Sequence, residues 1–381
     1  MANRRVWFPP LLFLPLCLLG CDPDDMPAYT PDGKTVIAMA HDAKGENVLW
    51  TCDVATGTTK AHRVGDGWNI RQARAFGGQV WVDCWQRVKE GESKWSTWRF
   101  DPAKNAILPG LADLARLDGA IPVGLDGGKH VVFGSPGHYV AYLFPEMKER
   151  KPLDLRPDVR LMAAGGFWSL RVHNKPAELA ATKESVEVER IDVFSPAGKQ
   201  VCSISRTEAD KVGEWEASHQ GRPAYAHVSK EGDVLLLAFG EQDRYGFGLF
   251  DTGSGKFLWG GESGPCVRGT PLVKRTEVWM IEQRGGKADA AKATTMPAMK
   301  KEVGIAMIRY APPAGTDAKP PVGEVVLEYP LDIDFNTDQF ALSPDNSHFV
   351  LVTVWRPHLL FIPIRQGATA KDVRVVELKE K

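Results

Sequence analysis

The sequence predicts an all-β protein, a β-propeller of about seven four-stranded blades. Three observations support this prediction: a strand–turn unit recurs along the chain, turn residues bound each strand, and helical periodicity is absent. A stretch at 111–117 is the best helical candidate, and it would form two turns at most. Insertions separate the repeats in the second half of the chain, so a propeller of six or eight blades is the alternative.

The second strand of each predicted blade is short, apolar and rich in β-branched or aromatic residues. Six of these seven strands follow a turn made of Gly, Asp or Asn, residues that tolerate the positive φ of tight turns. The predicted strands are residues 36–40, 79–85, 130–133, 167–172, 234–239, 277–281 and 349–355.

A third strand follows each of these and ends in a second turn. The second turns begin at residues 53, 101, 145, 195, 251, 311 and 365, so they recur at intervals of 44 to 60 residues. Four-stranded propeller blades run roughly 40–50 residues, which the first half matches and the second half exceeds by its insertions. The predicted third strands are residues 48–54, 95–100, 139–144, 186–194, 246–250, 305–310 and 358–364.

A ring of blades buries both faces of each sheet, which a single sheet cannot do alone. We therefore expect Leu236 and Val352, on second strands, to be buried on both sides. Val326, on an outer strand, is expected to face solvent. Residues 373–378 form an ordinary outer strand of the last blade, and no strand exchanged from the N-terminus is evident.

The N-terminus is a targeting segment. Arg4 and Arg5 precede an uncharged apolar stretch that is too short to span a bilayer, which takes ~20 residues. The stretch ends in Leu18-Leu19-Gly20-Cys21, which closely resembles the bacterial lipobox, where a small residue precedes a cysteine that becomes lipidated. An ordinary signal peptide is the alternative. The lipobox resemblance implies a signal peptide at 1–20, a lipidated Cys21 with a short tether at 21–27, and the propeller at 28–381.

The resemblance also implies a location in the bacterial cell envelope, facing the periplasm or exterior and attached to a membrane through Cys21.

The formal net charge of −1 argues against a nucleic-acid partner, which a basic patch would attract. An exported protein can hold disulfides. Cys52 and Cys84, on adjacent predicted blades, could form one, or both could be buried free thiols.

Several segments resemble known propeller repeats. Residues 29–40 (YTPDGKTVIAMA) and 342–353 (LSPDNSHFVLVT) are similar to the repeats of TolB-type periplasmic propellers. Residues 245–259 (YGFGLFDTGSGKFLW) and 47–59 resemble quinoprotein-type, WD40-like repeats. These resemblances imply the propeller fold and no particular function, because one fold serves many functions. The residues that bind a quinone in such enzymes are not recognisable here, so no cofactor is predicted.

Motifs that carry chemistry are few. Phosphate-binding, zinc-protease and nucleophile-elbow motifs are absent from the sequence. An alternating set of oxygen-bearing residues resembles a calcium loop, although Thr337 replaces its glycine and Ser343 its glutamate. A polar lead-in to the last blade explains the same residues equally simply. The set consists of Asp332, Asp334, Asn336 and Asp338.

Two further groups could line a ligand site. Trp81, Trp85, Trp95 and Trp98 gather in the second blade and could bind a glycan, or they could fill the space between sheets. Trp95 and Trp98 are three residues apart, so they cannot share a strand face. Glu216, His219 and His227 could line the mouth of the channel or serve as structural residues.

The sequence favours a binding or scaffold module for a protein, envelope or glycan partner. The alternative is a propeller enzyme, such as a lyase, hydrolase or quinone-dependent dehydrogenase, with its site at the central channel. Several His, Arg and acidic side chains converging in one central pocket would favour the enzyme.

Overall fold

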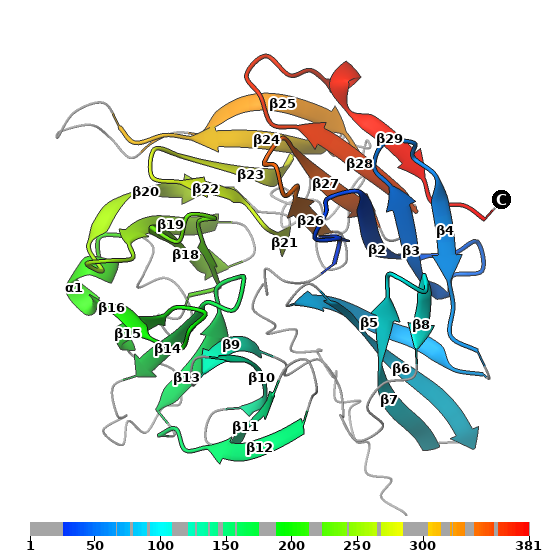
Figure 1. Ribbon diagram of the computed structural model, residues 1–381. Helices are drawn as coiled ribbons and strands as arrows, with labels where there is room; N and C mark the ends of the chain where they lie inside the picture. Colours follow the sequence, from blue (N-terminus) through cyan, green and yellow to red (C-terminus); the bar gives the residue numbers. More distant parts are fainter. Residues whose placement is uncertain are drawn as a thin grey trace, which may run out of the picture.

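The computed structural model is an all-β ring of seven sheets, as the sequence predicts (Figure 1). Each blade is an antiparallel meander whose strands we call a to d, from the axis outward. The structure describes residues 26–380 except 66, 77–78, 90–91, 109–120, 126–127, 136–137, 144–147, 157, 175–187, 213–222, 242–243, 265–267, 285–303, 314–320, 322, 332–338 and 354–356. All seven blades therefore lie in the chain that follows the predicted tether.

The first four blades follow one another in the chain. Blade 1 consists of β1 (Ala28–Tyr29), β2 (Thr35–His41), β3 (Asn47–Asp53) and β4 (Thr59–His62). Blade 2 consists of β5 (Asn69–Phe76), β6 (Gln79–Lys89), β7 (Glu92–Asp101) and β8 (Ala106–Leu108). Blade 3 consists of β9 (Ile121–Leu125), β10 (Gly128–Ser135), β11 (His138–Leu143) and β12 (Lys148–Leu153). Blade 4 consists of β13 (Val159–Ala163), β14 (Ser169–Asn174), β15 (Val188–Phe194) and β16 (Gln200–Ser205).

The last three blades complete the ring. Blade 5 consists of β17 (Tyr225–Val228), β18 (Val234–Glu241), β19 (Arg244–Asp251) and β20 (Phe257–Ser263). Blade 6 consists of β22 (Leu272–Lys274), β23 (Glu277–Arg284), β24 (Gly304–Tyr310) and β25 (Glu324–Pro330). Blade 7 consists of β26 (Gln339–Leu342), β27 (His348–Thr353), β28 (His358–Pro363) and β29 (Arg374–Glu377), with β21 (Arg268–Gly269) as a fifth strand. In the part of the chain that the structure describes, helix is limited to α1 (Arg206–Ala209) and the 3₁₀ turn η2 (Ala370–Asp372).

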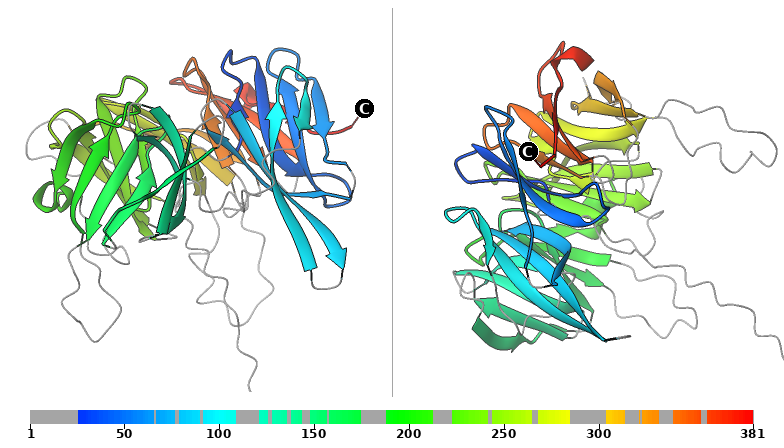
Figure 2. Two further views of the ribbon diagram at one scale, coloured as in Figure 1. Left: turned by 60° about the horizontal axis from the view of Figure 1, so that its bottom comes forward. Right: turned by 90° about the vertical axis from the view of Figure 1, so that its right-hand side faces the viewer.

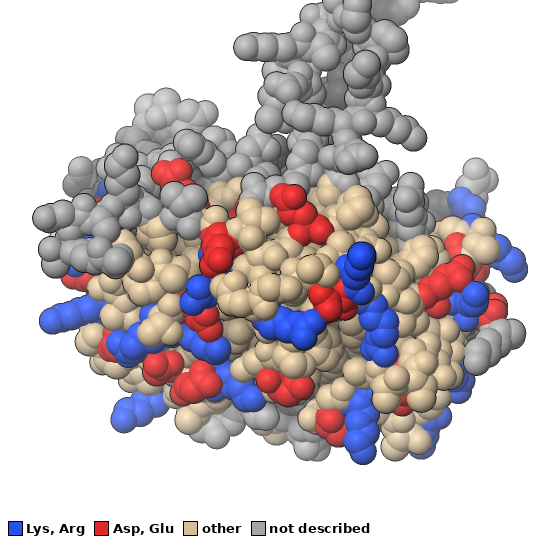
Figure 3. Space-filling model, turned by 90° about the horizontal axis from the view of Figure 1, so that it is seen from above, with Lys and Arg blue, Asp and Glu red and all other residues tan. Residues whose placement is uncertain are grey.

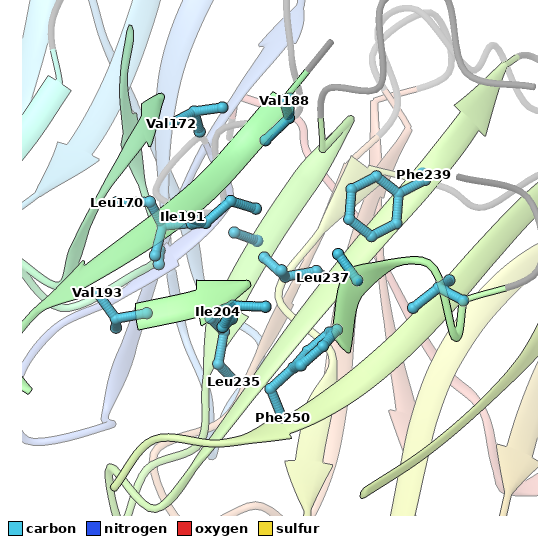
Figure 4. Close-up of a cluster of buried hydrophobic side chains, with 14 of the residues drawn as sticks. Leu170, Val172, Val188, Ile191, Val193, Ile204, Leu235, Leu237, Phe239 and Phe250 are labelled. Atoms are coloured by element: carbon cyan, nitrogen blue, oxygen red, sulfur yellow. The ribbon is translucent and has the colours of Figure 1, made fainter. Parts of the chain in front are cut away.

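Apolar clusters fill the space between neighbouring blades and hold the ring together. Figure 4 shows the cluster between blades 4 and 5, where Leu170 and Ile191 face Leu235 and Phe250. Leu236, next along β18, points the other way and packs into the cluster with blade 6. Leu236 and Val352 are both buried, as predicted for second strands between two sheets.

The expectation for Val326 is wrong. It lies half-buried against the cluster between blades 6 and 7, because outer strand β25 still turns one face toward its neighbour. Its neighbour Val325, on the other face of the strand, is 44% exposed.

The ring closes between blades 7 and 1 without a strand exchanged between the chain ends. Blade 1 begins with β1, and strands β26–β29 of blade 7 come from the C-terminal part. The joint is held by an apolar cluster around Trp50 and Phe361. The Tyr29 hydroxyl lies 2.8 Å from His348 Nε2 across the joint, and the Arg374 guanidinium donates to the Val54 carbonyl oxygen at 2.6 Å. Among the described residues, non-covalent contacts alone therefore close the ring.

Candidate functional site

The ring has two unlike faces. In every blade, the connection between strands a and b lies on the same face of the ring as the connection between strands c and d. We call this face the turn face. Its turns are compact: the Gly33 amide donates to the Thr30 carbonyl at 2.8 Å, and the Gly57 amide donates to the Asp53 carbonyl at 2.9 Å. Both glycines have positive φ, which the turns require. The sequence predicted these turns correctly.

The opposite face carries the connections between strands b and c and between successive blades; we call it the connection face. Here the chain leaves β14 at Asn174 and returns at Val188, and it leaves β23 at Arg284 and returns at Gly304. Because β1 runs toward the turn face, the N-terminal segment also enters the ring at the connection face. Loops carry binding and catalytic residues more often than the strands that support them. The connection face is therefore the candidate functional face.

The β6–β7 hairpin extends beyond the neighbouring strand ends on the connection face (Figure 2). Its four tryptophans differ in environment. Trp81 is buried, whereas Trp85 and Trp95 lie opposite one another, half-buried, with ring centroids 6.5 Å apart. Trp98 lies on the other face of the hairpin, where it packs toward blade 1 beside Trp68, 5.7 Å away. The prediction that Trp95 and Trp98 cannot share a face is confirmed.

Cationic groups lie over two of these rings. The Arg71 guanidinium carbon is 5.4 Å from the centre of the Trp95 ring. Lys94 Nζ is 5.9 Å from the centre of the Trp68 ring. A sugar that stacks on tryptophan needs an open ring face, so these contacts weigh against a glycan platform. Cation–π contacts of this kind contribute roughly 0.5–1 kcal/mol at exposed sites.

A polar cluster that the sequence analysis missed lies on the side of blade 4 that faces blade 3. Asp192 is its centre: His173 Nε2 lies 2.7 Å from Asp192 Oδ2, and Ser203 Oγ donates to Asp192 Oδ1 at 2.6 Å. Arg190 Nε lies 3.2 Å from the same Oδ1. Neighbouring residues such as Val172 pack toward blade 5, so strand alternation directs the polar side chains to the opposite side. The alternating pattern of residues 169–174 and 188–194 was the signal that could have revealed it.

The cluster is not arranged for nucleophilic catalysis. A serine nucleophile needs a histidine to accept its proton, whereas Ser203 donates to the Asp192 carboxylate. Arg171 stacks over the Phe194 ring at 4.3 Å; burial lowers the pKa of its guanidinium, and the nearby Asp192 opposes that effect. The cluster therefore neutralises charge between two blades, away from the axis. It is not the convergence of groups in a central pocket that would favour an enzyme.

Two histidines elsewhere, the buried His62 and the half-buried His227, are held in their uncharged forms near neutral pH. Burial lowers the pKa of His227 to about 4, and burial likewise lowers the pKa of His62 to about 4. Thr51 Oγ1 lies 3.0 Å from His62 Nε2. His227 is on inner strand β17, close to Gly165 of blade 4. Glu216 and His219, its predicted companions, lie outside the described residues.

The possible bridge between Cys52 and Cys84 is not formed, and both are free, buried thiols. The reason is geometric: Cys52 faces blade 7 and Cys84 faces blade 1, so the sheet of blade 1 stands between them. Burial raises the pKa of Cys52 to about 11 and that of Cys84 to about 12. Neither thiol therefore supplies a thiolate near neutral pH.

The calcium candidates Asp332, Asp334, Asn336 and Asp338 lie outside the described residues, as do Cys21 and the 111–117 stretch. Within the residues that the structure does describe, no three His, Cys, Asp or Glu side chains are grouped to hold a metal ion. In the same part of the chain, no helix is long and apolar enough to cross a membrane.

Strand β21 is the second feature that the sequence did not reveal. It leaves the connection between blades 5 and 6 and pairs in parallel with β26, strand a of blade 7 (Figure 1). Gly269 has a φ of +154°, and a Cβ at this position would overlap the Phe340 carbonyl oxygen. The Thr270 amide donates to the same oxygen at 3.2 Å. A two-residue strand that pairs with a segment far along the chain leaves no local pattern to read.

The surface charge is mixed. On the rim of the ring seen in Figure 3, Lys and Arg side chains alternate with Asp and Glu, without a broad basic field. Ion pairs such as Arg275 with Asp251, at 2.6 Å, join neighbouring side chains of opposite sign. This side of the molecule offers no continuous basic path for a nucleic acid.

The strands and faces together define a seven-bladed β-propeller, and comparison with known proteins supports the fold alone. No protein-family profile matches the chain, and no curated protein sequence matches it. Among solved structures, an oligogalacturonate lyase in complex with manganese is 10% identical with a TM-score of 0.51, over 91% of each chain. A chain of a mitotic checkpoint complex is 10% identical with a TM-score of 0.48, over 96% of this chain and 100% of that one. TolB from Acinetobacter baumannii is 18% identical with a TM-score of 0.36, over 64% of this chain and 55% of TolB.

Proposed function

We propose that the protein is a lipid-anchored propeller of the bacterial cell envelope that binds a protein or glycan partner at its connection face. The lipobox-like sequence that ends at Cys21 supports the anchor. Two or more acyl chains on such a cysteine hold a protein firmly, at ~0.8 kcal/mol for each buried methylene. The fold supports a binding role, since propellers present their inter-strand connections on a rigid ring.

The observation that carries the binding proposal is the asymmetry between the two faces. Most connections on the turn face are short turns whose side chains bond to their own backbone, as when Asp53 Oδ1 accepts the Thr56 amide at 2.7 Å and Asp251 Oδ1 accepts the Ser254 amide at 2.8 Å. The longest stretches between strands, from β16 to β17 and from β23 to β24, lie on the connection face, whereas the longest on the turn face, between β24 and β25, is shorter. A protein that used both faces equally would not place its two longest insertions on the same face.

The anchor is tested by replacing the cysteine. Cys21→Ser is expected to abolish incorporation of a fatty-acid probe and to release the protein from the membrane fraction, since the acyl chains are its attachment. Gly20→Ala, which keeps a small residue before the cysteine, is the control and should still be labelled. Equal labelling of Cys21→Ser and the wild type would contradict the anchor.

The binding face is tested by photo-crosslinking in intact cells. A crosslinking residue replaces one of two exposed lysines at opposite ends of β2, Lys44 on the connection face or Lys34 on the turn face. Lys94 and Lys104 provide a second matched pair on blade 2. Crosslinked species are expected from Lys44 or Lys94, on the connection face, and not from Lys34 or Lys104, on the turn face. Crosslinks from the turn face alone would overturn the assignment of the binding face.

The enzyme alternative stays a prediction. The described residues bring histidine, arginine and aspartate together between blades 3 and 4, where Asp192 already contacts Ser203, Arg190 and His173. No observation in the described part of the chain favours a particular reaction.

A further inference from the structure

The β6–β7 hairpin is longer than the ring requires. β6 has 11 residues and β7 has 10, whereas β2, the equivalent of β6 in blade 1, has seven. At ~3.3 Å per residue, four extra residues lengthen the strand by about 13 Å. This extra length lies on the connection face, where the hairpin projects past the neighbouring strands (Figure 2).

The projecting part carries an exposed apolar side chain and charged side chains of both signs, among which basic ones are more numerous in the described residues. Val88, near the tip, is 58% exposed, the largest exposed fraction among the large hydrophobic residues that the structure describes. Exposed Arg87 and Lys89 flank it, and exposed Lys94 lies across the hairpin. Lys89 Nζ pairs with the Glu92 carboxylate at 2.7 Å, an exposed contact that contributes little.

Half-buried tryptophans lie below this tip on both sides of the hairpin. Trp85 and Trp95 occupy one side, and Trp68 and Trp98 occupy the other. Indole rings beneath exposed basic side chains are typical of protein surfaces that lie in the lipid headgroup region, where an amphipathic ring meets both apolar and polar surroundings.

The predicted tether has a length that matches the projection. Met26, the first described residue, is buried between blades 1 and 2 at the connection face, so the described chain begins there. The five residue steps from Cys21 to Met26 span at most about 17 Å when fully extended. A lipid anchor at Cys21 therefore holds the connection face within about 17 Å of the membrane surface, and the hairpin extends about 13 Å into that gap.

We infer that the tip of the β6–β7 hairpin contacts the lipid surface and is a second point of membrane contact beside the anchor. The inference rests on the proposed lipid anchor at Cys21, which sets the distance. The basic side chains around Val88 outnumber the exposed Glu92 carboxylate in the described residues and complement anionic headgroups. The cations that cover the Trp95 and Trp68 rings favour a lipid surface over a stacked sugar.

The test places a fluorophore at the hairpin tip. The chain from residue 22 carries an N-terminal hexahistidine tag in place of Cys21 and is held on phosphatidylglycerol-containing vesicles by a nickel-chelating lipid. An environment-sensitive dye is attached to Val88→Cys or, as control, to Val325→Cys, which is similarly exposed on outer strand β25. The chain without an added cysteine gives the background from native thiols.

On vesicles, the dye at position 88 is expected to shift its emission to the blue and to be quenched at least twofold by headgroup spin-labelled lipid. The dye at position 325 should remain as in solution. A dye at position 88 that is as solvent-exposed on vesicles as in solution would overturn the inference. Because the tag replaces the acyl anchor, a failure of Cys21 lipidation leaves this result unaffected, and the fatty-acid labelling reports that failure separately.

Discussion

Replacement of Leu236 by alanine tests the central feature of the fold, the burial of a second strand between two sheets. Leu236 is 0% exposed and packs from blade 5 against Val278 and Met280 of blade 6. Its neighbours on β18, Leu235 and Leu237, pack the other way against blade 4. Because both faces of the strand are covered, the surrounding side chains have little freedom to fill the cavity that a truncated side chain leaves.

The expected loss follows from that rigidity. Leu→Ala changes in closed cores cost ~2–5 kcal/mol, the transfer free energy of the removed atoms plus the cost of the cavity left behind. We expect Leu236→Ala to fall in the upper half of that range. A domain typically has ~5–15 kcal/mol of stability in total, so Leu236→Asp, which adds an unpaired buried charge, should fail to accumulate as soluble protein.

Urea unfolding, followed by tryptophan fluorescence, measures the effect of Leu236→Ala. An unchanged slope of the free energy of unfolding against urea concentration would show that the same surface is exposed on unfolding. Val325→Ala is the matched control: this side chain is 44% exposed, and its loss should change the free energy of unfolding by less than ~0.5 kcal/mol. Equal midpoints for the two variants would refute the two-sided burial of β18 and with it the closed ring.

Three further predictions concern the buried polar groups and the inner strand. The free energy of unfolding should fall as the pH drops from about 6.5 toward 4, by ~1–2 kcal/mol for each of His62 and His227. The reason is that both histidines have a pKa of about 4 in the folded protein, so only the unfolded chain gains protons in that range. Thermal unfolding at several pH values measures this change, and a melting temperature that does not depend on pH in this range would contradict it. Asp192→Asn should lower the free energy of unfolding by ~2 kcal/mol, more than Ser203→Ala, because it leaves the adjacent cations uncompensated. Gly269→Ala should break the pairing of β21 and speed hydrogen exchange at the Thr270 amide while the ring persists, and unchanged exchange would show that β21 is not held as described.

The second and third strands of all seven blades could be predicted from the sequence because their burial is local and continuous. The run VLLLAF in β18 is apolar on both sides, since each side faces a sheet. The turn after β19 repeats the turn after β3: Asp251 and Asp53 each accept an amide three residues ahead, and a glycine with positive φ follows. Such signals lie within a few residues of one another and need no knowledge of the rest of the chain.

The polar cluster and the extra inner strand could not be located in the same way. The alternation of Leu170, Arg171, Val172 and His173 shows that β14 has one polar side, but not that Asp192 receives His173 and Ser203 there. That arrangement depends on the register between three strands. The sequence likewise separates Trp95 from Trp98, but the pairing of Trp98 with Trp68 arises from a connection between blades.

The point at which the chain enters the ring decides how an anchored molecule is oriented. Met26 is buried, and the next residues pair at once: Ala28 opposes Ile37 and Tyr29 opposes Val36. Five residue steps then separate this fixed point from Cys21, so the tether has little slack in which the ring could turn over. An anchor at Cys21 would therefore direct the connection face toward the lipid by chain length alone, before any partner binds. The β6–β7 hairpin lies next to this entry point, because Met26 packs in the cluster that joins blades 1 and 2. Anchor and hairpin together would give the propeller two neighbouring supports on one surface, and two supports restrict tilt where a single flexible one does not.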